Sequence, residues 1–436
     1  MKSTLPQKKP LTVSLETHGC KLNQADTGLM QWQFEEAGFN LVTDKHPADV
    51  YVLNTCTVTH ISDRKARQSL RNARRRNPEA IIVATGCYAE RSPDQLKELA
   101  EIDLIIGNKD KKDIVERVLA WRNDIPIPCS TGVDAEVFSP KIAKTRAMVK
   151  IQEGCNQVCA YCIVPKVRGR ERSRTPQEIL EEIAKYMSLG YKEIVLTGTQ
   201  LGSYGFDLRS MDLTKLVSKI LMETNFPRLR ISSLQPQEID DKFLDLWSDP
   251  RLCPHFHLPL QSGSDSILKR MNRRYSSNLY KLTVEKIRNR IPGSAITADV
   301  IIGFPGESNA DFKKTFLFCE NIGFAAMHVF PYSLRPGTTA YYLSNQISPE
   351  IKDDRMSSLL ELARENTFKY RQTQIGEELM VLWEEMKYIH GSLLWSGLTT
   401  NYVRVFTDST RDLANQITTT TIMSQQNDLV FANIKS

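Results

Sequence analysis

Three cysteines lie close together near residue 160, where Cys155, Cys159 and Cys162 have the spacing C-x3-C-x2-C. This spacing lets one short loop present three thiolates, which are the ligands that iron-sulfur clusters use. Three cysteines bind three of the irons of a four-iron cluster, and no further Cys or His follows until Cys253. The pattern therefore predicts a cluster with one iron open to a substrate or a cofactor.

Structural zinc and disulfides are the alternative uses of these thiols. A structural zinc site closes with four ligands, usually as C-x2-C pairs or with a His partner, whereas this loop offers three at unequal spacing. The chain contains nine cysteines, an odd number, and shows no sign of export, which argues against a disulfide framework. Gly154, Asn156 and Gln157 indicate an exposed turn rather than a run of buried residues. An iron-sulfur cluster is the interpretation that the loop favours.

Length and composition indicate a globular protein of several domains. A chain of 436 residues is too long for a single hydrophobic core, and 41% hydrophobic with 25% charged residues is ordinary for a soluble protein. The first ten residues lack the apolar core of a signal peptide, and no apolar run reaches the length of about 18 residues that a membrane span requires. We expect a cytoplasmic protein without a membrane partner, in a reducing compartment that suits thiols and clusters.

The first part of the chain alternates short β-rich runs with helical ones. Such alternation predicts a parallel, doubly wound α/β sheet. The predicted strands cover residues 11–16, 50–54, 80–85 and 103–106, and the predicted helices 25–37, 61–76, 93–100 and 113–121.

A second set of cysteines follows these strands. Cys20, Cys56 and Cys87 each come directly after a predicted strand. Because the carboxyl ends of parallel strands share one edge of a sheet, where ligands bind, these thiols are expected to converge. Isolated cysteines after strands are usually small buried hydrophobes, but three in register predict a second set of metal ligands.

After a predicted linker at residues 137–146, the β/α alternation starts again. Six units suggest a partial β/α barrel, whose active site lies at the carboxyl ends of its strands, and Cys155 follows the first of them. From residue 377 short strands predict a small antiparallel barrel of the OB type, a common nucleic-acid-binding module. We therefore expect domains at 1–136, 137–373 and 374–436. The predicted strands are 147–152, 193–197, 229–233, 255–260, 296–302 and 327–331, then 379–383, 393–395, 402–406, 418–423 and 429–432.

Positive charge is concentrated in two stretches of this chain, whose net charge is +6. The first is the predicted helix at 61–76, with Arg64, Lys65, Arg67, Arg71, Arg74, Arg75 and Arg76. The second is an expected extended segment with Lys166, Arg168, Arg170, Arg172 and Arg174. A basic helix is often only a solvated face, and its other common use is contact with nucleic-acid phosphates. The second stretch, directly after the cysteine loop, favours RNA.

Other residues at the ends of the later strands invite two interpretations. Glycines there let a ligand approach the backbone closely, although each alone is an ordinary turn. His255 and His257 face the same side of one strand, where they are either a metal pair or, as we favour, polar residues that line the barrel. Cys319 is expected in the core of its helix.

Together these motifs resemble the radical S-adenosylmethionine (SAM) methylthiotransferases. The loop with Tyr161 before its third cysteine is similar to the cluster motif of radical SAM enzymes, in which the open iron chelates SAM and a reduced cluster cleaves it to a 5′-deoxyadenosyl radical. The segments around Cys20, Cys56 and Cys87 resemble the family's N-terminal domain, which binds an auxiliary 4Fe-4S cluster that carries sulfur. The C-terminal strands resemble a TRAM domain, which holds tRNA. The segments after the later strands resemble, by their place in the chain, the family's SAM-binding segments. This resemblance implies SAM contacts for Gly198, Thr199, Ser232, Gly303 and Gly306.

The resemblance implies the activity as well. The sequence after Cys56 is most similar to the branch that adds a methylthio group to C2 of N6-threonylcarbamoyladenosine, next to the tRNA anticodon. Two SAM molecules, two 4Fe-4S clusters, an external electron donor and a sulfur source are implied. Two alternatives stay open: the same chemistry on isopentenyladenosine tRNA or a ribosomal-protein aspartate, and a non-enzymatic iron-sulfur protein that binds RNA and senses redox state.

Overall fold

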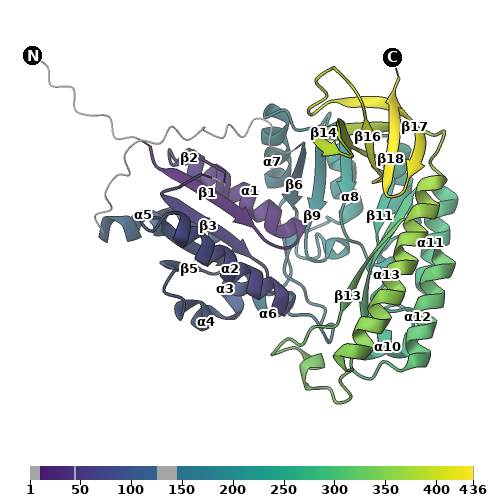
Figure 1. Ribbon diagram of the computed structural model, residues 1–436, viewed down its shortest axis with the longest axis horizontal. Helices are drawn as coiled ribbons and strands as arrows, with labels where there is room; N and C mark the ends of the chain where they lie inside the picture. The colour runs from purple at the N-terminus through teal and green to yellow at the C-terminus, as the bar shows by residue number, and fades with distance from the viewer. Residues whose placement is uncertain (1–9, 44–45, 125–144, 436) are drawn as a thin grey trace, which may run out of the picture. The chain divides into compact units, whose positions relative to one another are not determined.

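The computed structural model describes residues 10–43, 46–124 and 145–435, which form two compact units (Figure 1). Unit 1 contains the described residues before 125 together with residues 163–169. Unit 2 contains residues 145–162 and 170–435. Cys129 and most of the predicted linker at 137–146 lie outside the described residues, as do residues 1–9. No described helix is both long and apolar enough to cross a lipid bilayer.

Unit 1 is built on the predicted parallel sheet. Its strand order is β2-β1-β3-β4-β5, and all neighbouring strands are parallel, which confirms the doubly wound fold. The very short β2 was not predicted. The strands are β1 Thr12–Thr17, β2 Asn40–Leu41, β3 Val50–Thr55, β4 Ile81–Gly86 and β5 Leu104–Ile106.

Helices cover both faces of this sheet. α1 (Lys21–Glu36) and α5 (Ile114–Asp124) pack on one face, while α2 (His60–Arg76), α3 (Cys87–Arg91) and α4 (Pro93–Lys97) pack on the other. Strand β3 shows why both faces need cover, because its residues alternate between the two cores and all six are buried. Burial of each large apolar side chain contributes about 1.5 to 3 kcal/mol. The sheet is therefore a rigid support for the loops at its carboxyl edge.

Unit 2 begins with six parallel strands in the predicted sequence order. They form two sheets of three, β10-β9-β6 and β11-β12-β13, which are linked by the single bridges Leu229–Leu252 and Ser233–His257. The strands are β6 Arg146–Lys150, β9 Glu193–Thr197, β10 Arg228–Ile231, β11 His255–His257, β12 Ala295–Ile302 and β13 Ala326–Pro331. The helices between them are α7 Pro176–Ser188, α8 Leu213–Glu223, α9 Asp241–Asp245, α10 Asp265–Arg270, α11 Ser277–Arg290 and α12 Asn309–Ile322.

The C-terminal strands form a closed barrel in the order β14-β15-β16-β18-β17, after the long helix α13 (Pro349–Gln372). Strand β14 is longer than predicted, because it continues past Trp383 through a register irregularity before Glu385. The strand predicted at 418–423 is β17, which extends farther at both ends. The strands are β14 Glu378–Ile389, β15 Ser392–Thr399, β16 Arg404–Thr407, β17 Ile417–Gln426 and β18 Leu429–Ile434.

Buried charges fix this barrel on the strands of unit 2. Arg228 and Arg230 on β10 are fully buried on either side of Glu193 on β9, at 2.8 Å from its carboxylate. Arg228 donates to the carbonyl oxygens of Leu398 and Thr399 (2.9 and 3.0 Å), and Arg230 donates to that of Thr400 (3.0 Å). The turn after β15 is thus held by guanidinium groups that have no access to water.

The second basic stretch is not the single extended segment that we expected. Residues Val164–Val167 form the short helix α6, and only Arg172 and Ser173 are in a strand, β8, which pairs with β7 (Gln152–Glu153). Arg168 is buried, and Arg174 is bound by Glu182 and by the Lys150 carbonyl oxygen. Alternation of charge in the sequence therefore did not correspond to a single exposed edge.

Candidate metal centres

Cys20, Cys56 and Cys87 lie at the carboxyl edge of the unit 1 sheet. Cys20 precedes the first residue of α1, Cys56 directly follows β3, and Cys87 begins α3 directly after β4. In the strand order, chain connections diverge between β1 and β3, which is the topological switch point where doubly wound sheets bind ligands. The structure thus brings the three predicted ligands to the expected edge.

The three thiols are close enough to affect one another. Burial raises the pKa of Cys56 to about 11, and the nearby charges of Cys20 and Cys87 act in the same direction. A side chain at Gly19 would lie 2.9 Å from the Cys56 Sγ atom, so the loop before Cys20 packs directly on Cys56. Cys20 is exposed, whereas Cys56 and Cys87 are buried, and buried thiolates are unfavourable alone and become favourable when iron supplies positive charge. The donor set therefore fits a metal cluster.

The ligands of a cubane bind different irons, so they lie farther apart than the ligands of one ion. Among the described residues, no three His, Cys, Asp or Glu side chains surround one point closely enough to hold a single metal ion.

Glycines in the left-handed region of φ turn the chain before three of the six cysteines. Gly19, Gly86 and Gly154 have φ values of +100°, +95° and +78°. Other residues rarely adopt this conformation, so each glycine sets the direction from which the next thiol leaves the backbone. The Gly-Cys pairs are thus a local device that both sites share.

Asn23 ties together the loops that carry Cys20 and Cys56. Its side-chain amide donates to the carbonyl oxygens of His18 (2.7 Å) and Thr55 (3.0 Å), and its own backbone carbonyl accepts a bond from Asn54 (2.8 Å). Each contact lies within three residues of a predicted cluster ligand. The sequence offered no signal for this role beyond the position of Asn23 in the helix after Cys20.

The loop with Cys155, Cys159 and Cys162 lies in unit 2, between the short strands β7 and β8. Cys155 and Cys159 are buried, Cys162 is partly exposed, and the Cys162 N–H donates to the Cys159 carbonyl oxygen (3.0 Å). The Gln157 N–H lies 3.4 Å from the Cys155 Sγ atom, and an Arg273 guanidinium nitrogen lies 3.5 Å from that of Cys159. Such N–H donors stabilise thiolates and tune the potential of a cluster bound to them. This loop also fits a cluster.

Comparison with known proteins gives a family match for each part of the chain that contains a cysteine set. Residues 12–107 match an uncharacterized protein family, UPF0004, and residues 149–319 match the radical SAM superfamily. The threonylcarbamoyladenosine tRNA methylthiotransferase MtaB of Bacillus subtilis (strain 168) is 36% identical over 416 residues, which cover 93% of this chain and 92% of that relative. The tRNA-2-methylthio-N(6)-dimethylallyladenosine synthase of Dictyoglomus thermophilum is 35% identical and covers 91% of this chain and 92% of the relative.

The chain belongs to the radical SAM methylthiotransferase family. The family's cofactors are SAM and two 4Fe-4S clusters. In fold, the chain is similar to the radical SAM methyltransferase TsrM from Kitasatospora setae, with a TM-score of 0.55 and 15% identity over 76% of this chain and 77% of that one.

In this methylthiotransferase, the segment after β9 contains two of the predicted SAM contacts. A side chain at Gly198 would lie 2.9 Å from Leu201 and 3.0 Å from the Gln152 carbonyl oxygen. The Thr199 hydroxyl is buried and has no hydrogen-bond partner within the described structure. Buried hydroxyls are normally satisfied, so this one is suited to a ligand. Ser232, after β10, is buried, and its N–H donates to the Leu196 carbonyl oxygen (3.1 Å).

Gly303 and Gly306 form a turn after β12 that is bound within unit 2. Their φ values are +67° and +77°, and the Gly303 N–H donates to a Glu307 carboxylate oxygen (2.7 Å). The same carboxylate pairs with Arg355 of α13 at 2.6 Å. The glycines are thus required by the turn itself, and their contact with SAM stays a prediction.

A polar network next to the cysteine loop was missed by the sequence analysis. Gln235 donates to the side-chain oxygens of Gln157 (3.0 Å) and Gln200 (2.6 Å), and Gln200 in turn donates to Glu238. Burial raises the pKa of Glu238 to about 7, although the Gln235 N–H and Arg273 lower it. These residues come from separate loops, so no sequence pattern shows that they meet.

The histidines of β11 make the polar contacts that we favoured over a metal pair. His255 stacks on Tyr402, with ring centroids 4.2 Å apart, and both His255 and His257 contact the Thr297 hydroxyl. Cys319 is fully buried in α12, which confirms its predicted place in the core.

Proposed function

We propose that this enzyme adds a methylthio group to C2 of N6-threonylcarbamoyladenosine next to the anticodon of tRNA. The observation that carries the proposal is similarity along nearly the whole chain to the Bacillus subtilis relative named for this substrate. The Dictyoglomus relative is named for dimethylallyladenosine, and the experiment below separates the two targets. Because tRNA is the substrate, the enzyme acts in the cytoplasm.

The two cysteine sets receive different roles in this proposal. We assign Cys155, Cys159 and Cys162 to the cluster that binds SAM, with contacts from Gly198, Thr199, Ser232, Gly303 and Gly306. We assign Cys20, Cys56 and Cys87 to the auxiliary cluster. When bound, the SAM-binding cluster would supply the electron that cleaves SAM, and the auxiliary cluster would supply the sulfur. An external electron donor is required, and so is a sulfur source, because each turnover removes one sulfur atom.

The chain's own residues determine how these thiolates are held. Gly19, Gly86 and Gly154 aim three of the six thiols. Asn23 fixes the loops at one site, and Arg273 donates to a thiol at the other. Such positioning keeps the ligand sets in place before the cofactors bind.

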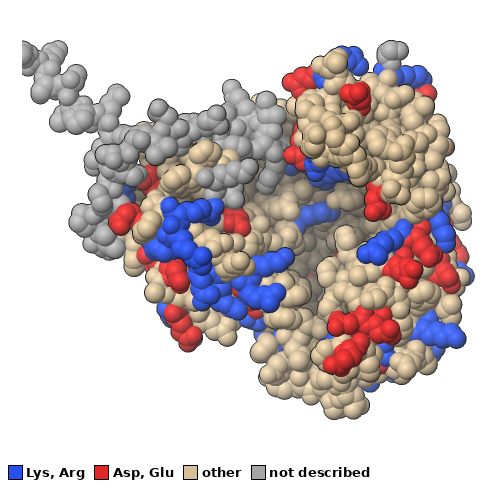
Figure 2. Space-filling view, in the orientation of Figure 1, with Lys and Arg blue, Asp and Glu red and all other residues tan. Residues whose placement is uncertain are grey.

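The exposed face of α2 is the surface of unit 1 that we propose for tRNA phosphates. Asp63, the one acidic residue of α2, is buried and paired with Arg91 at 3.0 Å, whereas the exposed positions from Arg64 onward have only cations and amides. Figure 2 shows Lys and Arg side chains gathered over this helix. The exposed residues of that face are Arg64, Lys65, Gln68, Arg71, Asn72, Arg75 and Arg76. In unit 2, we propose that the TRAM-like barrel also binds tRNA.

Mass spectrometry of tRNA nucleosides from a deletion strain tests the substrate. We expect 2-methylthio-N6-threonylcarbamoyladenosine to disappear and its precursor without the methylthio group to accumulate. Loss of a methylthio-dimethylallyladenosine instead would identify the other substrate. If no methylthio nucleoside is lost, the tRNA proposal is wrong.

Cysteine variants of the reconstituted enzyme test the division of roles. We expect Cys159→Ala to abolish formation of 5′-deoxyadenosine from SAM. Cys56→Ala should keep part of that cleavage and lose methylthiolation. Iron and sulfide should each be about eight per chain in the parent enzyme, for two cubanes. Equal loss of both activities in a folded Cys56→Ala protein contradicts the assignment.

A further inference from the structure

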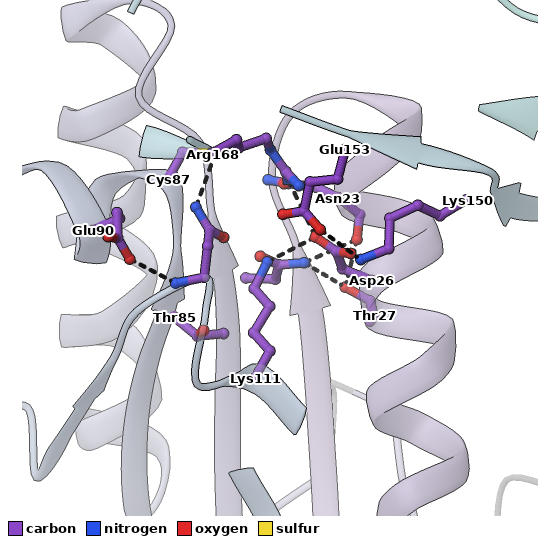
Figure 3. Close-up of polar contacts among 12 residues, drawn as sticks. Asn23, Asp26, Thr27, Thr85, Cys87, Glu90, Lys111, Lys150, Glu153 and Arg168 are labelled. Atoms are coloured by element: carbon purple, nitrogen blue, oxygen red, sulfur yellow. Dashed lines mark hydrogen bonds and ion pairs between the residues drawn. The ribbon is translucent and has the colours of Figure 1, made fainter. Parts of the chain in front are cut away.

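Near Cys20, Cys56 and Cys87, unit 1 contains a buried group of three charged residues, Asp26, Lys111 and Arg168 (Figure 3). The Lys111 Nζ atom lies 2.8 Å from an Asp26 carboxylate oxygen, and an Arg168 guanidinium nitrogen lies 3.2 Å from the same oxygen. The side chains of Asp26 and Arg168 are each 2% exposed, and that of Lys111 is 10% exposed. Within unit 1, one carboxylate thus faces two cations where little water reaches them.

The charged group is connected to the loops that carry Cys20 and Cys56. Arg168 donates to the side-chain oxygen of Asn23, which is the residue that binds the carbonyl oxygens of His18 and Thr55. In Figure 3, Asn23, Asp26 and Thr27 extend from the same helix, α1, toward Lys111 and Arg168. The group therefore supports the backbone on both sides of Cys20 and next to Cys56.

Cys87 is connected to the same part of unit 1. It packs against Ile163 and Val167, from the segment that ends near Arg168. The Asn108 amide lies 3.8 Å from the Cys87 Sγ atom and donates to the Val167 carbonyl oxygen (2.7 Å). Burial lowers the pKa of Lys111, while the charges of Asp26 and of Cys87 raise it, so Lys111 and Cys87 interact electrostatically.

We propose that Asp26, Lys111 and Arg168 set the reduction potential of the auxiliary cluster, through the fixed charge that each of them holds beside Cys20, Cys56 and Cys87. Reduction adds one negative charge to a cluster, and a fixed cation in a water-poor region stabilises the reduced state. These three are positioning residues, because they act on the thiolate site without touching substrate. The inference rests on the proposed assignment of the auxiliary cluster to these cysteines.

Charge determines the sign of each expected shift. Lys111→Met removes a cation, so at a fixed potential the ratio of reduced to oxidised cluster should fall about tenfold, which is about 59 mV for a one-electron couple. Asp26→Asn removes an anion, so the ratio should rise by a similar factor. The double variant should return close to the parent. A role in packing alone gives no reason for opposite shifts.

The measurement requires the auxiliary cluster alone. We would replace Cys155, Cys159 and Cys162 by Ala in the full chain, reconstitute it anaerobically, and follow the reduced cluster by electron paramagnetic resonance during a dithionite titration without SAM or tRNA. Iron should be about four per chain in every variant. Lys112→Met is the matched control, because Lys112 is the next residue and is exposed. Its midpoint should equal that of the parent.

Three results overturn the proposal. The first is an unchanged midpoint in Lys111→Met, and the second is a shift of both single variants in the same direction. The third is loss of iron from both Lys111→Met and Asp26→Asn, together with loss of iron from Lys111→Arg, the variant that keeps the charge. If the three-alanine background itself binds no cluster, the proposed function fails instead, so the two failures are distinguishable.

Discussion

Glu238 is a carboxyl group whose environment makes folding depend on pH. Burial raises its pKa from 4.5 to about 7, so between these values the folded state binds more protons than the unfolded state. The free energy of unfolding contributed by this proton is fully present below about pH 4.5 and is lost as pH rises through 7. We expect the difference in free energy of unfolding between Glu238→Gln and the parent to shift by about 1 kcal/mol in favour of the variant as pH rises from 6 to 8.

Denaturant unfolding at pH 6, 7 and 8 measures this effect as the difference between variant and parent. Glu223→Gln is the control, because Glu223 is exposed on α8 and, among the residues that the structure describes, forms an ion pair with Lys219 alone. It should follow the parent at all three pH values. Parallel profiles for Glu238→Gln and the parent would show that Glu238 does not titrate in this range.

The cysteines and the polar network differ in how far the sequence can predict them. Cys20, Cys56 and Cys87 were placed at one edge because each follows a strand that its β-branched and apolar residues identify. Gln157, Gln200 and Gln235 meet only because three loops converge, and glutamine is common on surfaces. Short-range patterns contain no information about such long-range contacts.

At the scale of elements, the exposed face of α2 makes a quantitative prediction about tRNA binding. Arg64 and Arg75 are exposed and have no ion-pair partner in the described part of the chain, whereas Arg67 bonds to Tyr88 and Arg74 to Asp103. If Arg64 and Arg75 contact phosphates, Arg64→Gln/Arg75→Gln should reduce the slope of log affinity against log salt by about 0.7 to 0.9 per lost contact. Thermal stability should not change.

The matched control for α2 is Lys313→Gln/Lys314→Gln, which removes two exposed cations from α12. Filter binding of tRNA at several salt concentrations compares the two double variants. The control should keep the slope of the parent. Equal slopes for all three proteins would mean that α2 is only a solvated face.

Most elements were predictable, and the errors have physical causes. Strand β2 has only two residues and therefore no periodicity. Helix α1 begins at Lys21, four residues earlier than predicted, and its N-cap residue Cys20 makes no side-chain capping bond that would mark the start. In contrast, the sequence marks the start of α7 clearly, because Thr175 and Glu178 form a capping box and Pro176 occupies the first turn.

For the molecule as a whole, the buried charges under the C-terminal barrel should matter more than any surface pair. Although burial raises it, the charges of Arg230 and Arg228 lower the pKa of Glu193 to about 2. Glu193→Gln leaves two buried guanidinium groups without their counter-charge, so we expect the free energy of unfolding of unit 2 to fall by about 3 to 5 kcal/mol. Chemical denaturation measures the loss. Glu223→Gln, at an exposed pair, should cost less than about 1 kcal/mol, and an equal cost for both would refute the role of Glu193.

The segment 163–169 has a further consequence for biosynthesis. Unit 1 includes this segment, so a nascent chain that ends before it lacks Arg168 and the residues that pack on Cys87. By the time the ribosome has added the segment, Cys155, Cys159 and Cys162 have also been synthesised. All six cysteines are therefore already in the chain when unit 1 becomes complete, whereas Arg273, which lies 3.5 Å from the Cys159 Sγ atom, is synthesised about a hundred residues later, so the unit 1 site is complete before the unit 2 site.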